Sequence, residues 1–213
     1  MAEMKDATLY STLSWQDQLS NQGYCYLPNQ TDAQLDEILN VLGQVIQETD
    51  VIADAKSPNL VTSDQALDFH TDNHLARYIV WYCQQPAPKG GMSLLCDAEL
   101  VYAQLNEEEK NLLSKIHVYE HKVFPENRNS NPIVRETGGQ RKFYYSFWLA
   151  RKKYREMPVF KHWCNLIKAT PAIKIHLKQH DTLVIDNHRM FHGRTAIEGN
   201  RFLKRYWLSL NAE

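Results

Sequence analysis

A histidine and an aspartate stand two residues apart at His70-Thr71-Asp72, and no other His-x-Asp or His-x-Glu triplet occurs in the chain. On an extended segment, residues i and i+2 point to the same side, so imidazole and carboxylate would converge. With a distant histidine they would form a 2-His-1-carboxylate set, which suits Fe(II). Nine histidines and 25 acidic residues predict about one such triplet by chance. On the triplet alone, His70 is better interpreted as a histidine satisfied in a loop.

The segment 181–205, DTLVIDNHRMFHGRTAIEGNRFLKR, supplies further groups of the right kind. We expect a strand to end at Asp186-Asn187, with His192 following it. Arg201 and Arg205 stand four residues apart, across a short loop and the start of the last strand. This order can deliver a metal-binding histidine and a guanidinium to one pocket, and arginine suits a carboxylate held by two hydrogen bonds. Taken in isolation, the segment RFLKR fits a solvated basic edge strand as well as it fits an anion-binding site.

The elements that must position these groups are mostly short strands. Residues 78–83 (YIVWYC) are β-branched and aromatic without a helical stripe, which is typical of a buried strand. The other strands are expected at 23–28, 92–96, 118–124, 133–135, 141–147, 173–177, 182–185 and 205–210, with a turn at Gly138-Gly139. Residues 56–68 are polar and aperiodic, which indicates a loop.

Three helical segments interrupt the strands. Thr31 is the expected cap of a helix whose apolar positions are Leu35, Ile38, Leu39, Leu42 and Val45. Residues 98–116 are helical in pattern, with a break at Asn106, which would cap a new helix. Pro158 opens a helix to about residue 169. Many short strands with few helices predict a mainly β, α+β fold, a sandwich or barrel with helical buttresses.

Composition limits the function classes. Twenty-four Lys and Arg against 25 Asp and Glu leave a net charge of -1, so nothing global indicates a nucleic-acid partner. No apolar run approaches a membrane span, and the N-terminus lacks signal-peptide character, so a cytoplasmic protein is expected. The four cysteines are scattered and are expected to be reduced core or strand residues. The length predicts a single domain over 1–213, with a core at about 67–210 and the strand and helix of 1–55 packed on it. The oligomeric state is left open.

Three segments together resemble the taurine dioxygenase-like (clavaminate synthase-like) oxygenases, which use Fe(II), 2-oxoglutarate and O2. HTDN at 70–73 is similar to their first metal motif, and DNHRMFHGRTAI followed by RFLKR is similar to their distal histidine and arginine motif. PAPKGGMSLLCDAELVYAQLNEEEKNLL resembles the middle of the family, and the segments follow the family order. The resemblance implies a double-stranded β-helix, a cupin-like jelly roll, with iron at one open end.

The resemblance also implies roles for individual residues. His70, Asp72 and His192 would be the iron ligands and the catalytic centre. Arg201 would hold the distal carboxylate of 2-oxoglutarate, and Ser93 would support that carboxylate with its hydroxyl.

The remaining motif residues are expected to be structural: Asn73 and Arg194 within their motifs, and 186–187 in the turn before the distal histidine. The implied reaction is hydroxylation of an unactivated C–H bond of a small polar metabolite, such as an amino acid or a carboxylate, with release of succinate and CO2. By analogy with relatives, Arg205 would contact an anionic group of that substrate. The other expected substrate contacts are His74, Tyr145 and Phe147, and further candidates, each otherwise a scaffold residue, are Phe69, Tyr144, Trp148 and Arg151.

Some positions depart from the family pattern. His180-Asp181 stands where a Gly-Asp pair is usual, Ile197 stands where an aromatic residue is frequent, and the short chain puts a substrate lid in doubt. Two other classes use the same residues: a Zn(II)-dependent hydrolase and a non-catalytic jelly-roll binding protein. A hydrolase would have no use for Arg201, and a binding protein would be expected to have lost a ligand. Retention of Asp72 argues against a halogenase.

Overall fold

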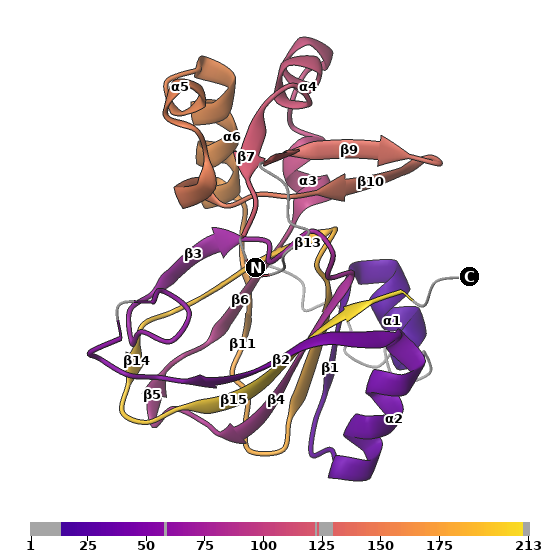
Figure 1. Ribbon diagram of the computed structural model, residues 1–213, viewed down its shortest axis with the longest axis vertical. Coiled ribbons are helices and arrows are strands. Elements are labelled where there is room, and N and C mark those ends of the chain that lie inside the picture. The colour runs from indigo at the N-terminus through magenta and orange to yellow at the C-terminus, as the bar shows by residue number, and fades with distance from the viewer. Residues whose placement is uncertain (1–13, 58, 122, 124–129, 211–213) are drawn as a thin grey trace, which may run out of the picture.

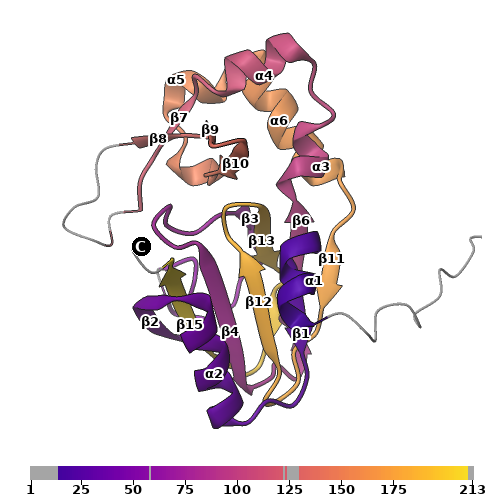
Figure 2. The same cartoon turned by 90° about the vertical axis from the view of Figure 1, so that its right-hand side faces the viewer.

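The computed structural model describes residues 14–57, 59–121, 123 and 130–210. Two antiparallel sheets form the lower part of the molecule, and a layer of helices with a short hairpin lies above them (Figure 1, Figure 2). The larger sheet contains, in spatial order, β1 (Tyr24–Leu27), β12 (Thr182–Asp186), β4 (Tyr78–Gln85), β15 (Phe202–Ser209) and β2 (Gln44–Ile52). The smaller sheet contains β11 (Ile173–Ile175), β6 (Ser93–Asp97), β13 (Met190–Arg194) and β3 (Leu67–His70).

Three two-stranded pairs and a set of helices complete the described elements. The pairs are β5 (Lys89–Gly90) with β14 (Ile197–Glu198), β7 (His117–Tyr119) with β8 (Ser130–Pro132), and β9 (Val134–Thr137) with β10 (Gln140–Phe143). The helices are α1 (Trp15–Gln22), α2 (Asp32–Leu42), α3 (Ala98–Tyr102), α4 (Glu107–Leu113), α5 (Lys152–Arg155) and α6 (Pro158–Ala169), with a 3-10 turn at Phe147–Leu149. None of the helices in this part of the chain has the length and apolar character that a membrane span requires.

The alternation of side chains along the central strands separates two cores. On β4, Ile79 packs in the core between the two sheets, whereas Val80 packs beneath α1 and α2 on the outer face. On β12, Leu183 and Ile185 point inward and Val184 points outward in the same way. Because successive strand residues face opposite sides, a strand covered on both faces is apolar throughout, as the sequence of β4 indicated.

A third core joins the upper layer to the smaller sheet. Phe143, Trp163 and Phe191 pack together there, with ring centroids of Trp163 and Phe191 5.8 Å apart. Phe191 belongs to β13, so the helices above the sheets are anchored on the strand that also carries His192. The mainly β, α+β jelly-roll fold expected from the sequence, with helical buttresses, is confirmed.

Most predicted elements lie where expected. The side chains of Thr31 and Asn106 accept the capping hydrogen bonds of α2 and α4, each in a capping box. The prediction was wrong at Val45, which belongs to β2 rather than to the helix before it. Gly43 ends α2 at φ 136°, and a Cβ there would stand 2.2 Å from the carbonyl oxygen of Ser209, so only glycine fits this turn into β2.

Other differences concern element bounds. The strands β2, β3, β5, β8, β13 and β14 and the helices α1 and α5 were not predicted. Residues 67–68, expected in a loop, begin β3, and the strand expected at 141–147 ends at Phe143. The strand expected at 118–124 is observed as β7, and its end lies outside the described residues. All four cysteines are free thiols, with three buried and Cys164 half-buried, as expected.

Candidate metal centre and adjoining cavity

The two histidines of the predicted triad lie opposite each other on neighbouring antiparallel strands. His70, the last residue of β3, is the direct cross-strand partner of His192 on β13, and their ring centroids are 4.3 Å apart. Cross-strand neighbours project from the same face of a sheet, so the two imidazoles point to one place. Gly193 permits this pairing, because a Cβ there would stand 2.4 Å from the carbonyl oxygen of Leu67 on β3.

Asp72 reaches the same place from the loop that follows β3. Its backbone N–H donates to the side-chain oxygen of Asn187 at 2.8 Å. The amide nitrogen of Asn187 in turn donates to the carbonyl oxygens of Asn73 and Ala76 at 3.2 and 2.9 Å. One buried asparagine side chain therefore fixes three points of the loop that carries Asp72. The sequence predicted only that Asn187 shapes the turn before the distal histidine. The structure shows that its side chain also binds a loop more than 100 positions away in the sequence.

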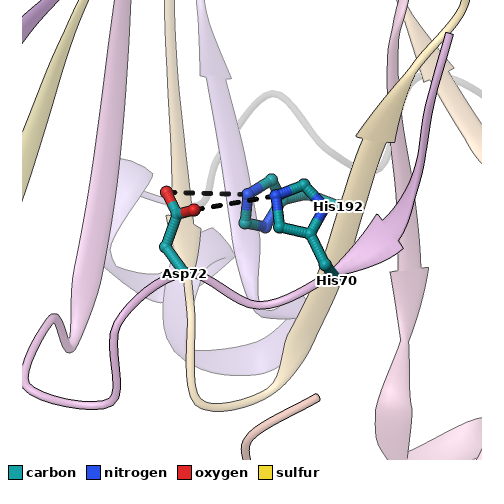
Figure 3. Close-up of side chains that lie close together, drawn as sticks. All are labelled: His70, Asp72 and His192. Carbon is teal, nitrogen blue, oxygen red and sulfur yellow. Dashed lines mark ion pairs between the residues drawn. The ribbon is translucent and has the colours of Figure 1, made fainter. Parts of the chain in front are cut away.

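The three side chains form a buried cluster suited to a metal ion (Figure 3). The Nε2 atoms of His70 and His192 lie 3.6 and 3.8 Å from the two carboxylate oxygens of Asp72, and one ligand atom from each residue lies within 4.8 Å of the others. His70 Nδ1 donates to the carbonyl oxygen of Asp68 at 2.8 Å, which leaves the Nε2 lone pair facing the cluster. Two imidazoles and one carboxylate are the donor set of a non-haem Fe(II) centre with open positions.

The protonation states of the cluster also fit a metal site. Burial lowers the pKa of His192 well below its usual value, with the nearby His70 adding to the effect, so the ring is neutral and able to ligate. Burial by itself would raise the pKa of Asp72, but the positive Arg205, with His70 and His192, holds that pKa well below its usual range. Asp72 is therefore a carboxylate.

Two residues of β15 donate to the same oxygen of Asp72. Arg205 donates from a terminal guanidinium nitrogen to Oδ2 at 3.0 Å, and Trp207 donates from Nε1 to Oδ2 at 2.8 Å. The guanidinium carbon of Arg205 also lies 4.9 Å from the ring centroid of Trp207. Arg205, predicted as a substrate contact, thus lies at the metal cluster with Asp72 as its partner.

Aromatic rings enclose the two histidines. Trp148, a further substrate-pocket candidate, lies with its ring centroid 5.0 Å from that of His70. Trp81 of β4 lies 5.1 Å from His192, edge to face. Nδ1 of His192 has no hydrogen-bond partner within the described residues, so contact with neighbouring rings, rather than a hydrogen bond to this nitrogen, holds its orientation.

A cavity adjoins the cluster inside the sheets, and the predicted co-substrate residues line it. Its walls contain His70, His192, Ser93 and Arg201, with apolar side chains between them. Arg201 is 6% exposed, and its guanidinium forms no hydrogen bond or ion pair with any residue that the structure describes. Burial, and next the charge of Arg194, lower the pKa of Arg201 to about 10. A buried guanidinium without a protein partner, still charged at neutral pH, fits the binding of an anion here.

Arg194 fixes the loop that covers this cavity. Its guanidinium donates to the carbonyl oxygens of Leu60, Val61 and Ser63 at 2.8, 2.9 and 2.7 Å. Val61 itself lines the cavity. A structural role was expected for Arg194. In the structure, this residue holds the polar loop whose Val61 forms part of the cavity wall.

The predicted substrate contacts other than Arg205 lie in different places. His74 follows the triad loop, and its Nε2 lies 3.9 Å from Oε1 of the buried Glu120. The ring of Tyr145 packs in the upper core against Phe191, and its hydroxyl lies 3.3 Å from Cys164 Sγ. Phe147 is 44% exposed on the 3-10 turn. The structure therefore brings Arg205 to the triad, places Tyr145 in the upper core and leaves Phe147 partly exposed.

Sequence reasoning missed two residues of the site, Trp81 and Trp207. Both occur in strands that contain several aromatic residues, where a tryptophan is ordinarily a core residue. The only available signal was their spacing: Trp207 stands two residues after Arg205, so the two share a face of β15. That Asp72 lies opposite this face follows from the packing of the sheets.

Solved structures of low sequence identity share this fold. A crystal structure of asparagine oxygenase matches with a TM-score of 0.72 at 14% identity, over 89% of this chain and 74% of that one. The non-haem iron oxygenase OrfP in complex with Fe and alpha-ketoglutaric acid matches with a TM-score of 0.69 at 15% identity, over 90% and 76% of the two chains. No curated protein matches the chain in sequence.

Comparison with protein-family models gives stronger evidence of the family than the solved structures do. The description of that family is taurine catabolism dioxygenase TauD, TfdA family, and the match spans residues 10–207. This span contains all three members of the buried triad, and also Ser93 and Arg201, the two predicted co-substrate residues that line the cavity. The predicted class, an Fe(II)- and 2-oxoglutarate-dependent dioxygenase that uses O2, is confirmed, and the chain belongs to the TauD/TfdA family.

Proposed function

We propose that this dioxygenase hydroxylates a free amino acid or a similar small metabolite that carries a carboxylate. The observation that carries the proposal is the placement of Arg201: a buried, charged guanidinium without a protein partner lines the same cavity as the metal ligands. A dicarboxylic co-substrate can therefore reach the metal with one end while its other end meets Arg201. A hydrolytic metal site would have no use for this cation.

His70, Asp72 and His192 would hold the iron. Iron with bound 2-oxoglutarate and O2 supplies an oxidant strong enough to remove hydrogen from an unactivated C–H bond. The three side chains are buried, and His70 is held in the ligating tautomer by Asp68. The chain therefore offers a preformed centre, and its main contribution to the reaction is to position the reactants.

Arg201 and Ser93 would bind the distal carboxylate of 2-oxoglutarate. Ser93 lies on β6 opposite Arg194 of β13, and it lines the cavity with Arg201. The cavity also has apolar lining side chains, which would exclude water around the chain of a bound co-substrate: Val51, Val61, Leu67, Leu95 and Leu203. A low-polarity wall strengthens the attraction between the guanidinium and the carboxylate, because little water screens it.

The substrate class rests on Arg205 and on the structural relatives. Besides the nitrogen that donates to Asp72, Arg205 has an Nε–H group without a partner in the described residues. This remaining donor supports a contact with a substrate carboxylate. One similar structure is asparagine oxygenase with Fe(II), 3-hydroxyasparagine and succinate, and another is OrfP with a hydroxyarginine. These complexes favour an amino acid as substrate.

The proposal is tested by succinate release from 2-oxoglutarate under air, with Fe(II) and a panel of free amino acids that begins with L-asparagine and L-arginine. Stimulated succinate release with a hydroxylated amino acid is expected, and no product is expected from Asp72→Ala. A metal-dependent turnover that leaves 2-oxoglutarate unused would overturn the proposal. Succinate release stimulated only by substrates that lack a carboxylate would overturn the substrate class alone.

A further inference from the structure

The two oxygens of Asp72 have unequal surroundings. Oδ2 accepts one hydrogen bond from Arg205 and one from Trp207, at 3.0 and 2.8 Å. Within the described residues, no hydrogen bond of ordinary length reaches Oδ1, which lies 3.6 Å from Nε2 of His70. A carboxylate oxygen has two lone-pair sites, so the two donors occupy those of Oδ2 and leave those of Oδ1 for a metal.

We infer that Arg205 and Trp207 are positioning residues that hold Asp72 through Oδ2, so that it ligates the metal through Oδ1 alone. The inference rests on the proposed iron centre and goes beyond it, because it assigns a function to Trp207 and a second function to Arg205. Neither residue touches the metal in this arrangement. Both act through the orientation of the carboxylate.

The surrounding packing makes this pair of donors rigid. Arg205 and Trp207 are 7% and 3% exposed, and they stand at i and i+2 on β15, which is paired on both sides with β4 and β2. The guanidinium lies over the Trp207 ring at 4.9 Å, so the indole supports the other donor as well as donating itself. The backbone of Asp72 is held independently by Asn187. The carboxylate is thus oriented from two sides before a metal arrives.

Trp207→Phe removes the indole N–H but retains an aromatic ring beneath Arg205. With one donor lost, Oδ2 regains a free lone pair, and the carboxylate can turn towards two-oxygen coordination. Removal of groups that orient a metal ligand commonly weakens metal binding 10- to 100-fold. We therefore expect the dissociation constant for Co(II), used as an air-stable probe, to rise about tenfold in this variant.

The matched control is Trp163→Phe. Trp163 is also fully buried, and its Nε1 has no partner in the described part of the chain, but it lies in the upper core. This variant shares the loss of indole volume and is expected to bind Co(II) as the wild type does. Arg205→Met, which removes the other donor and the charge, is a second variant should Trp207→Phe fail to fold by circular dichroism.

The experiment is a Co(II) titration of the full-length apoprotein against a competing chelator, followed by X-ray absorption of the Co(II) forms. Weaker binding in Trp207→Phe or Arg205→Met than in Trp163→Phe, and a higher oxygen coordination number, would support the inference. Wild-type affinity and coordination in both site variants would overturn it. Failure of the wild type itself to bind Co(II) would instead overturn the proposed metal centre.

Discussion

The side-chain oxygen of Asn187 accepts the backbone N–H of Asp72 at 2.8 Å, across 115 positions of the sequence. Asn187 follows β12 directly and precedes the strand that carries His192. The same residue thus ties the segment that supplies one metal ligand to the loop that supplies another. This amide therefore helps to set the relative placement of the carboxylate and the distal histidine.

We predict that Asn187→Ala weakens Co(II) binding by about tenfold. It removes three buried hydrogen bonds to backbone groups, of Asp72, Asn73 and Ala76. The free energy of unfolding should fall by about 2 to 4 kcal/mol. Urea denaturation and a Co(II) titration measure the two effects. The exposed Asn111→Ala is the control, and equal behaviour of the two variants would contradict the assignment.

We predict that Arg201→Leu separates co-substrate binding from metal binding. The variant should require at least about 100-fold more 2-oxoglutarate for half-saturation, because a charge-assisted pair in a buried site is lost. Co(II) affinity should stay within about twofold of wild type, since Arg201 contacts none of the metal ligands.

The thermal stability of the same variant gives an independent check. Arg201 is a buried cation without a protein partner, so its replacement by an apolar side chain should not lower the melting temperature of the ligand-free protein. Added 2-oxoglutarate with Co(II) should stabilise the wild type beyond Co(II) alone, but not the variant. Equal stabilisation of both proteins would show that the co-substrate carboxylate binds elsewhere.

We predict that Arg194→Ala loosens the loop over the cavity. Its guanidinium donates to three carbonyl oxygens of this loop, those of Leu60, Val61 and Ser63, and an alanine leaves all three without this donor. Limited proteolysis should cut within residues 59–66 about fivefold faster, because local opening is easier. Arg194→Lys, which restores one cationic donor, should be intermediate. Unchanged cleavage would assign the rigidity of the loop to its own internal contacts.

We predict that His188 contributes to acid sensitivity. Burial lowers its pKa from 6.5 to about 4; the hydrogen bond with His74 opposes this shift, and the charges of Arg77 and Lys142 reinforce it. Below pH 6.5 the unfolded chain takes up a proton at this site and the folded chain does not, so stability falls until about pH 4. The loss is about 1.4 kcal/mol per pH unit, or about 3 kcal/mol in total.

His188→Gln should therefore show a shallower decline of unfolding free energy between pH 6.5 and 4 than the wild type, even if it is less stable at pH 7. Urea midpoints at several pH values provide the measurement. His176→Gln, at an exposed position, is the control and should follow the wild-type profile. A variant profile parallel to that of the wild type would assign the acid sensitivity to other groups, such as the buried His121.

The local sequence was sufficient for most elements and for the types of residue at the site. The buried strand at β4 and the caps of α2 and α4 follow from side-chain pattern and from hydrogen bonds within four residues, which do not depend on the rest of the fold. The failure at Val45 has a tertiary cause. Its apolar spacing continues that of the helix, but close approach of Gly43 to the last strand redirects the chain.

The sequence by itself determined which groups could ligate a metal and bind a dicarboxylate: His70, Asp72, His192 and Arg201 carry the required chemistry in their side chains, in a recognisable order. Only the tertiary structure decided how they meet. The pairing of β3 with β13 sets the two imidazoles side by side, and β15, from another sheet, supplies the donors to Asp72. The same packing turned Tyr145 into the upper core. The contacts between the two histidines, and those of β15 with Asp72, join residues more than 120 positions apart. Their geometry is set by sheet register and packing rather than by local spacing.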